Sequence, residues 1–196
     1  MDAKSHIFSQ GTLPTHLHIL CRGFVKLTVK RGSRHSAVVR VASPGAALGL
    51  FAALSDCEYE LSAHTLTPVH LRSLSRDAFL SLMSKWPEIQ RRALQSICQD
   101  YFFAHQQFCR AVLSANVDDR LNQLLVDMAG SLDSDSEEAG LRIPFLLTQS
   151  EIATMIGTTR ESVSRSLREL RKRESREKTI SGIVPMRESG TSEVMA

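Results

Sequence analysis

The sequence predicts an α+β fold, with an antiparallel β-roll first, one long helix next and a helix-turn-helix near the C-terminus. Short β-rich runs alternate with turn residues up to about residue 75, and from Asp77 the apolar residues recur at helical spacing. Residues 148–170, TQSEIATMIGTTRESVSRSLREL, then read as two short amphipathic helices. We therefore expect three parts: a roll over residues 1–84, a long helix over 85–116 and a C-terminal domain over 117–196.

The strands of the roll are predicted from β-branched and apolar residues that glycine and proline interrupt. The expected strands are Leu17–Leu20, Phe24–Val29, Ala37–Val41, Glu60–Thr67 and Val69–Ser73. Gly23, Arg31–Ser33 and Pro44–Gly45 provide turns between them. Runs this short, separated by turns, indicate a small antiparallel barrel or roll.

The middle of the chain predicts a short helix over Asp77–Met83 and a much longer helix that begins at Pro87. The longer helix carries apolar residues at alternating steps of four and three, a heptad-like stripe suited to packing on a partner helix. The stripe consists of Leu94, Cys98, Tyr101, His105, Phe108, Val112 and Ala115. We therefore expect a homodimer whose interface runs along this stripe.

The C-terminal domain opens with a predicted helix over Arg120–Ala129, which Asn116–Asp119 can cap. A polar, acidic surface loop is expected over Gly130–Gly140, followed by a strand-like segment, Leu141–Leu146. The helix-turn-helix comes directly after this segment.

Local signals define both helices of the helix-turn-helix. Thr148 with Glu151 forms a capping-box pair at the start of the first helix, and Gly157 can end that helix with a positive φ. Thr159 can cap the second helix. The expected buried faces are Ile152, Met155 and Ile156 in the first helix and Val163, Leu167 and Leu170 in the second.

The opposite face of the second helix is polar and basic, which favours DNA as its partner. Guanine offers two acceptors to an arginine fork, and cytosine offers an amino donor to a glutamate. The predicted base-contacting residues are Arg160, Glu161, Ser164 and Arg165. The predicted phosphate-contacting residues are Thr148, Gln149, Ser150, Thr159, Ser162 and Arg168. From the pattern alone, an ordinary surface helix pair with a solvated charged face stays open as an alternative.

The charge distribution agrees with a DNA-binding C-terminal part. The 196 residues carry a net charge of +3; residues 1–140 hold 14 basic and 14 acidic side chains, whereas residues 141–196 hold 10 and 7. The basic excess therefore lies around the second helix, where a duplex-binding face would need it.

Other classes of protein are not indicated. There is no run of about 18 apolar residues and no signal-peptide core, so we expect a cytoplasmic protein that does not bind membranes. The four cysteines show no CxxC spacing. Neither a nucleophile–base motif nor a phosphate-binding glycine loop is present, so we predict no enzyme activity, no catalytic residues, no metal site and no cofactor.

The order of these segments resembles the Crp–Fnr family of bacterial transcription regulators. The matching pieces are Ile7–Gly11, Ile19–Leu27, Pro44–Leu50, Tyr59–Pro68 and the helix-turn-helix. The resemblance covers about residues 5–175 and implies a cyclic nucleotide-binding-like β-roll, a long dimerisation helix and a winged helix-turn-helix. It also implies double-stranded DNA, a second copy of the chain and RNA polymerase as partners.

The family further implies inverted-repeat promoter sites with TGTGA-like or TTGAT-like halves. Arg160, Glu161 and Arg165 match the base-reading positions of cyclic-AMP receptor relatives, while Glu161, Ser164 and Arg165 match the ExxSR pattern of the fumarate–nitrate branch. Both half-sites stay open at this point.

The chain departs from the family at its effector pocket. Members that bind cyclic nucleotides use a glutamate for the ribose and an arginine followed by serine for the phosphate. Here these positions are Ala47, Leu61 and Ser62, and only the serine is kept. Burying a phosphate without a cation is costly, so we expect a pocket degenerate for cyclic nucleotides.

Two alternatives concern the signal and the wing. Cys98, His105 and Cys109 share one helix, which leaves open a haem, metal or thiol redox sensor of the same family with impaired DNA binding; the plain alternative is cysteine packed in a helix seam. Ser175–Arg176 stands where the family has an apolar pair leading into the wing. We therefore expect the wing hairpin, near Thr179–Val184, to be poorly packed or shifted.

Overall fold

The computed structural model describes residues 1–32, 35–113, 116–130 and 145–177. Its contacts divide the chain into two compact units, Met1–Leu113 and Ser114–Ala196.

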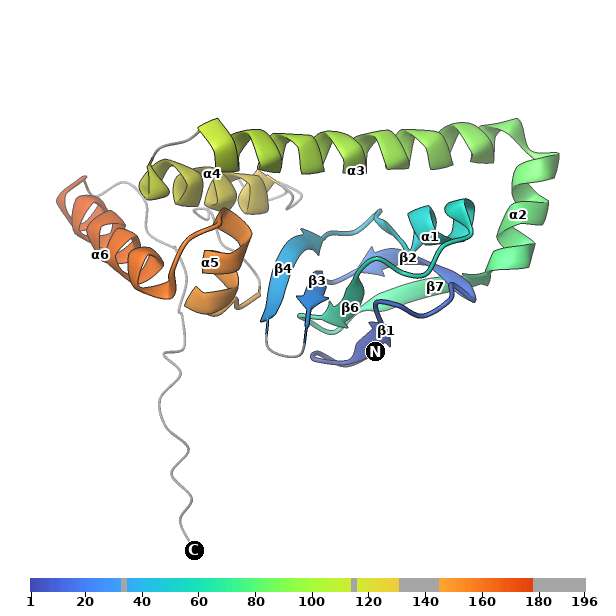
Figure 1. Ribbon diagram of the computed structural model, residues 1–196, viewed down its shortest axis with the longest axis horizontal. Helices are drawn as coiled ribbons and strands as arrows, with labels where there is room; N and C mark the ends of the chain where they lie inside the picture. The colour runs from blue at the N-terminus through green and yellow to red at the C-terminus, as the bar shows by residue number, and fades with distance from the viewer. Residues whose placement is uncertain (33–34, 114–115, 131–144, 178–196) are drawn as a thin grey trace, which may run out of the picture. The chain divides into compact units, whose positions relative to one another are not determined.

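The first unit contains two antiparallel sheets (Figure 1). The larger sheet has the order β1 (His6–Phe8), β6 (Ser62–Thr65), β3 (Val25–Arg31) and β4 (His35–Ala42). The smaller sheet has the order β5 (Ala47–Leu48), β2 (His16–Arg22) and β7 (His70–Ser75). All pairings between these strands are antiparallel, so the predicted antiparallel roll is confirmed.

The structure differs from the sequence prediction in the shortest elements. Strands β1 and β5 and helix α1 (Leu50–Ser55) were not predicted. They have three, two and six residues, respectively, which is too few to show a period. The predicted strand over Glu60–Thr67 was too long at both ends, since β6 covers only its central residues, and β7 runs two residues beyond the predicted Ser73.

The core of the roll is built around an aromatic pair. The rings of Phe8 and Tyr59 stack with centroids 4.1 Å apart, and the Tyr59 hydroxyl donates to the carbonyl of His16 at 2.7 Å. Gly49 lies against this tyrosine with a φ of 79°. The stack thus connects β1 to the loop before β6.

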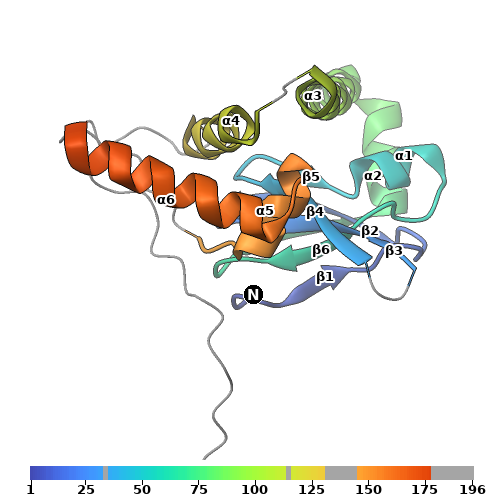
Figure 2. The same cartoon turned by 60° about the vertical axis from the view of Figure 1, so that its left-hand side comes forward.

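Three helices complete the first unit. Helix α2 (Arg76–Lys85) begins at Ser75, whose Oγ accepts from the Ala78 N–H, and α3 (Pro87–Leu113) runs for 27 residues, so both predicted helices are confirmed. A second core cluster joins β2, α1, α2 and α3 through Leu17, Leu50, Phe79 and Ala93. Helix α3 therefore packs on the roll through α1 and α2 (Figure 2). Within the described residues, no helix is both long and apolar enough to cross a bilayer.

The second unit is helical where the structure describes it. It consists of α4 (Val117–Gly130), α5 (Gln149–Ile156) and α6 (Arg160–Glu177). Helix α4 begins earlier than predicted, with Asn116 Oδ1 accepting from the Asp118 N–H at 3.0 Å. The core of the second unit contains Leu121, Leu124, Leu125, Met128, Phe145, Leu147, Ile152, Ala153, Ile156, Val163 and Leu167.

Several predictions for the second unit fall outside the described residues. These are the acidic loop over residues 131–140, the strand-like residues 141–144 and the wing over 179–184. The described end of the expected strand, Phe145–Leu146, is not in a strand. The backbone of Ser175–Arg176 belongs to α6.

Candidate functional site

The start of α5 is fixed by a reciprocal cap. The Glu151 N–H donates to Thr148 Oγ1 at 3.2 Å, and the Thr148 N–H donates to Glu151 Oε2 at 2.8 Å. Two backbone donors at the helix start are thereby satisfied, and the predicted capping box is confirmed.

The turn between α5 and α6 is short and depends on Gly157. This residue has φ 65° and ψ 50°, and the N–H groups of Gly157 and Thr158 both donate to the Ala153 carbonyl. Thr159 then caps α6, since its Oγ1 accepts from the Ser162 N–H at 3.3 Å. The predicted helix end and cap are therefore both confirmed, and they determine the angle between the two helices.

One face of α6 is buried and holds the helix on its neighbours. Val163 and Leu167 are buried, as predicted, together with Ser166, while Leu170 is half-buried. Ile152 and Ile156 of α5 are buried as well. Because these apolar residues fix the rotation of α6, the opposite face is presented to solvent.

The solvent face of α6 gathers the predicted base-contacting residues. Arg160, Glu161 and Arg165 are exposed, and Ser164 is half-buried beside them. Their spacing places them along one side of the helix, starting at its N-terminus. Arg168 continues this side, and its Nη2 donates to Ser164 Oγ at 3.3 Å. Ser164 is a predicted base-contacting residue and Arg168 a predicted phosphate-contacting residue. The hydrogen bond between them was not predicted from the sequence.

The predicted phosphate-contacting residues lie mostly at the N-terminal ends of α5 and α6. Thr148, Ser150 and Thr159 are exposed, and Gln149 and Ser162 are half-buried. The first N–H groups of a helix carry partial positive charge, so these two ends favour anionic groups.

The stripe predicted on α3 is exposed along its whole described length. Its apolar members include Leu94 at 64%, Tyr101 at 71% and Phe108 at 67% exposure. Cys98, His105 and Val112 are exposed as well, and Phe102 and Leu113 extend the surface beyond the predicted stripe.

The cysteines of α3 give no support to a metal site. Cys109 Sγ lies 3.8 Å from His105 Nδ1, whereas Cys98 lies about two helical turns before His105 and is exposed. In the part of the chain that the structure describes, no group of three or more His, Cys, Asp or Glu side chains is placed to hold a metal ion.

The first unit also contains a cavity of about 310 Å³ between the roll and α3. Ala47 and Leu61, two of the three predicted pocket residues, line it. Ser62 is absent from the lining; it is buried, and its Oγ accepts from the Gln10 N–H at 2.9 Å. The serine that the family pattern retains is therefore used within the fold.

Three charged residues of the described lining were not predicted from the sequence: Arg40 on β4, Glu60 and Asp100 on α3. A β-bulge near Val39 interrupts the pairing of β3 with β4, and both Val39 and Arg40 line the cavity. The Arg40 guanidinium forms an ion pair with Asp100 of α3 and lies 5.4 Å from the centroid of the Phe103 ring. For Arg40, the sequence did contain one indication: it is a charged residue inside the otherwise apolar run Ala37–Val41.

A β-roll, a long helix with an exposed apolar stripe and a helix-turn-helix with a basic solvent face define a DNA-binding transcription regulator. Comparisons with known proteins agree. Residues 1–85 match the family model of the cyclic nucleotide-binding domain, and residues 119–184 match that of the Crp-like helix-turn-helix domain.

Two curated relatives come from Mycobacterium tuberculosis. The chain is 26% identical over 161 residues to a CRP-like cAMP-activated global transcriptional regulator, covering 82% of this chain and 71% of the relative. It is 30% identical over 152 residues to the HTH-type transcriptional regulator Cmr, covering 77% of this chain and 57% of that protein.

Solved structures share the fold. FixK2 from Bradyrhizobium japonicum superposes with a TM-score of 0.75 at 16% identity, covering 88% of this chain and 82% of the other. A CRP-family transcriptional regulator from Thermus thermophilus gives 0.72 at 20% identity, covering 88% and 84%. The chain belongs to the Crp–Fnr family of transcription regulators and is not an enzyme.

Proposed function

We propose that the protein is a homodimeric, sequence-specific transcription regulator that binds inverted-repeat promoter sites. The observation that carries this proposal is the solvent face of α6, where Arg160, Glu161 and Arg165 project from a helix whose other face is buried. Residues 1–84, 85–116 and 117–196 would act as roll, dimerisation helix and DNA-binding domain.

In this proposal the N-terminal part of α6 enters the major groove. Arg165 holds a guanine through two hydrogen bonds, and Glu161 accepts from a cytosine amino group. Arg160 and Ser164 contact neighbouring base edges. The half-site is TGTGA-like or TTGAT-like, as the family implies.

Contacts with phosphate set the position of the helix on the duplex. We assign this role to Thr148, Gln149, Ser150, Thr159, Ser162 and Arg168. Neutralising phosphates releases counterions, so binding should weaken steeply as the salt concentration rises.

The dimer forms along α3 through Leu94, Cys98, Tyr101, His105, Phe108 and Val112. Their exposure in the single chain supports this, because large apolar side chains repeated along one helix are otherwise left in water. A symmetric dimer presents its two recognition helices about 34 Å apart, one turn of duplex. RNA polymerase is the expected further partner of the dimer on DNA.

The roll is degenerate as a cyclic-nucleotide site. Ala47 and Leu61 stand where a ribose and a phosphate need polar partners, and the Ser62 hydroxyl oxygen accepts a backbone hydrogen bond. A relative is described as cAMP-activated, but this chain lacks the side chains for that ligand.

The test compares three arginine variants on the preferred duplex and on single-base changes of it. Arg160→Ala and Arg165→Ala should each lose about 1–3 kcal/mol of binding and relax the preference at one base pair. Arg168→Ala serves as the matched control: it should weaken binding evenly across sequences and lower the salt dependence. Wild-type base preference retained in both Arg160→Ala and Arg165→Ala would refute the assignment.

A further inference from the structure

We propose that the cavity between the roll and α3 binds an uncharged aromatic small molecule in place of a cyclic nucleotide. The inference rests on the proposed function, since it names the ligand class of that regulator. It follows from the lining, the charges and the position of the cavity.

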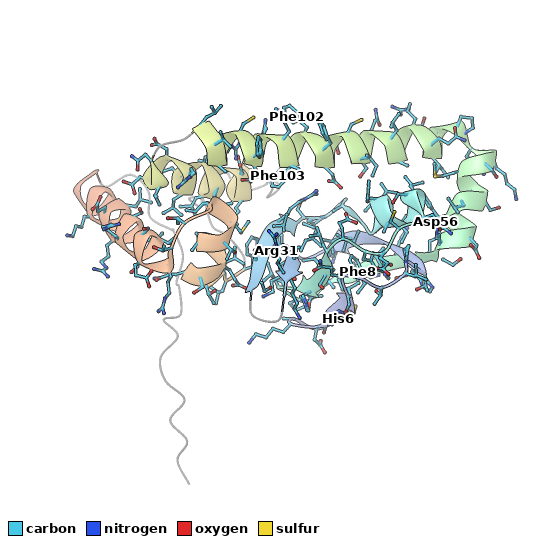
Figure 3. All side chains as sticks on the ribbon, viewed as in Figure 1. His6, Phe8, Arg31, Asp56, Phe102 and Phe103 are labelled. Carbon is cyan, nitrogen blue, oxygen red and sulfur yellow. The ribbon has the colours of Figure 1, made fainter. Side chains whose placement is uncertain are left out.

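Aromatic side chains line the cavity from both sides. Phe8 and Tyr59 come from the roll as a stacked pair, Phe51 from α1 and Phe103 from α3. In Figure 3, Phe103 lies on the side of α3 that faces the roll, whereas Phe102 lies on the other side. A ring placed among these groups finds the stacked and edge-on contacts that aromatic pairs prefer. The volume of about 310 Å³ is at the lower end for small-molecule sites, so the ligand is compact.

The charges of the lining disfavour a phosphate. Among the lining residues that the structure describes, Arg40 is the only basic one, whereas Glu60 and Asp100 are both acidic. Because the Arg40 guanidinium is paired with Asp100 and lies over the Phe103 ring, an anion would have to break an existing ion pair. Leu61 offers no second cation. The remaining surface is largely apolar, and a charged ligand would lose its hydration there without compensation.

The position of the cavity connects ligand binding to the proposed dimer helix. Asp100, Phe103, Ala104 and Gln107 line the cavity from α3. They alternate along this helix with exposed residues of the stripe, such as Tyr101 and Phe108. A bound ligand would add contacts between the roll and α3, and it would thereby favour one placement of the helix that carries the dimer surface.

The first test uses the full chain and N-phenyl-1-naphthylamine, an uncharged aromatic amine whose fluorescence rises when it leaves water. We expect saturable binding of one probe per chain, and we expect that cyclic AMP in large excess does not displace it. Displacement by cyclic AMP at equimolar concentration would overturn the proposal.

Two variants fill the cavity from opposite sides. Ala47→Leu acts from β5 and Ala104→Phe from α3, and each should weaken probe binding by about tenfold or more. Ala111→Phe is the matched control, because Ala111 lies on the same helix and outside the lining, and it should bind the probe like the wild type. Thermal unfolding of each variant confirms that it is folded.

Absence of saturable binding, or equal binding by the wild type and both filled variants, would contradict the proposal. The second result would place the probe on the exposed surface of α3. The titration contains no DNA, so its outcome is independent of the arginine variants that test the proposed function. If base selectivity is lost but the probe still binds, only the proposed function fails. If the probe does not bind but base selectivity is as expected, only the proposed ligand fails.

Discussion

Arg40 of β4 and Asp100 of α3 form an ion pair that joins the roll to the long helix. The same guanidinium lies over the ring of Phe103, 5.4 Å from its centroid. One cation thus connects two elements far apart in the sequence and lines the cavity. The pair is half-exposed, with side-chain exposures of 24% and 43%.

A double-mutant cycle with Arg40→Met and Asp100→Asn measures this pair. Water screens half-exposed charges, so we expect a coupling energy of about 1 kcal/mol or less. Urea unfolding followed by the fluorescence of Trp86, the only tryptophan of the chain, provides the measurement. A coupling energy well above this range would mean that the pair acts as a buried interaction.

Gly49→Ala should destabilise the roll more than Gly45→Ala does. Both glycines have positive φ, at 79° and 93°, so each substitution strains the backbone by about 1–3 kcal/mol. Only at Gly49 would the new Cβ also meet Tyr59, at 2.6 Å from Cε1, whereas nothing lies within 4 Å at Gly45. The difference in the free energy of unfolding between the two variants therefore isolates the contact with Tyr59. Equal losses would contradict it.

Removing the cap of α5 should loosen the helix that precedes the recognition helix. Thr148→Ala deletes the acceptor of the Glu151 N–H, which typically costs about 1 kcal/mol of stability. Amide hydrogen exchange in α5 should accelerate accordingly. Ser150→Ala is the control, since Ser150 is exposed in the same turn and is not the capping residue. Unchanged exchange in Thr148→Ala would show that the cap does not hold the helix.

The stability of the first unit should fall as the pH drops below neutrality. Burial lowers the pKa of His18 below its ordinary value of 6.5, and the neighbouring His16 lowers it further. Burial also lowers the pKa of His64, with His6, Lys26 and Lys30 adding to the effect. As the pH falls below 6.5, these histidines take up protons in the unfolded chain before they do so in the folded chain. The free energy of unfolding therefore decreases as the pH falls below 6.5.

Unfolding of the wild type and of His18→Gln at several pH values checks this expectation. The variant keeps a polar side chain beside Ser73, to which His18 Nδ1 is hydrogen-bonded at 2.8 Å, but it cannot titrate. Its stability should therefore vary less with pH than that of the wild type. An identical pH dependence would rule out a contribution from His18.

The helix-turn-helix was predictable because its signals are local. A capping pair, one glycine with positive φ and apolar residues at helical spacing are read within about 20 residues, and the structure contains each of them. The same holds for α3, whose period extends over 27 residues. Local rules also indicated the exposed face of α6, since the buried stripe fixes its rotation.

The roll was predictable only in outline because its contacts are not local. β1 pairs with β6, more than 50 residues away, and a strand of three residues carries no alternation to read. Likewise, Arg40 meets Asp100 across 60 residues. The sequence predicted that Ala47 and Leu61 do not fit a cyclic nucleotide. The cavity that they line together with Arg40 depends on contacts between the strands and α3, which no local pattern shows.

Selection of bound duplexes from a random pool, with the purified protein at a stated, moderate salt concentration, shows whether α6 recognises DNA sequence within a dimer. We expect enrichment of an inverted repeat with TGTGA-like or TTGAT-like halves, one duplex turn apart between their centres. Binding that depends on salt but shows no sequence preference would contradict it.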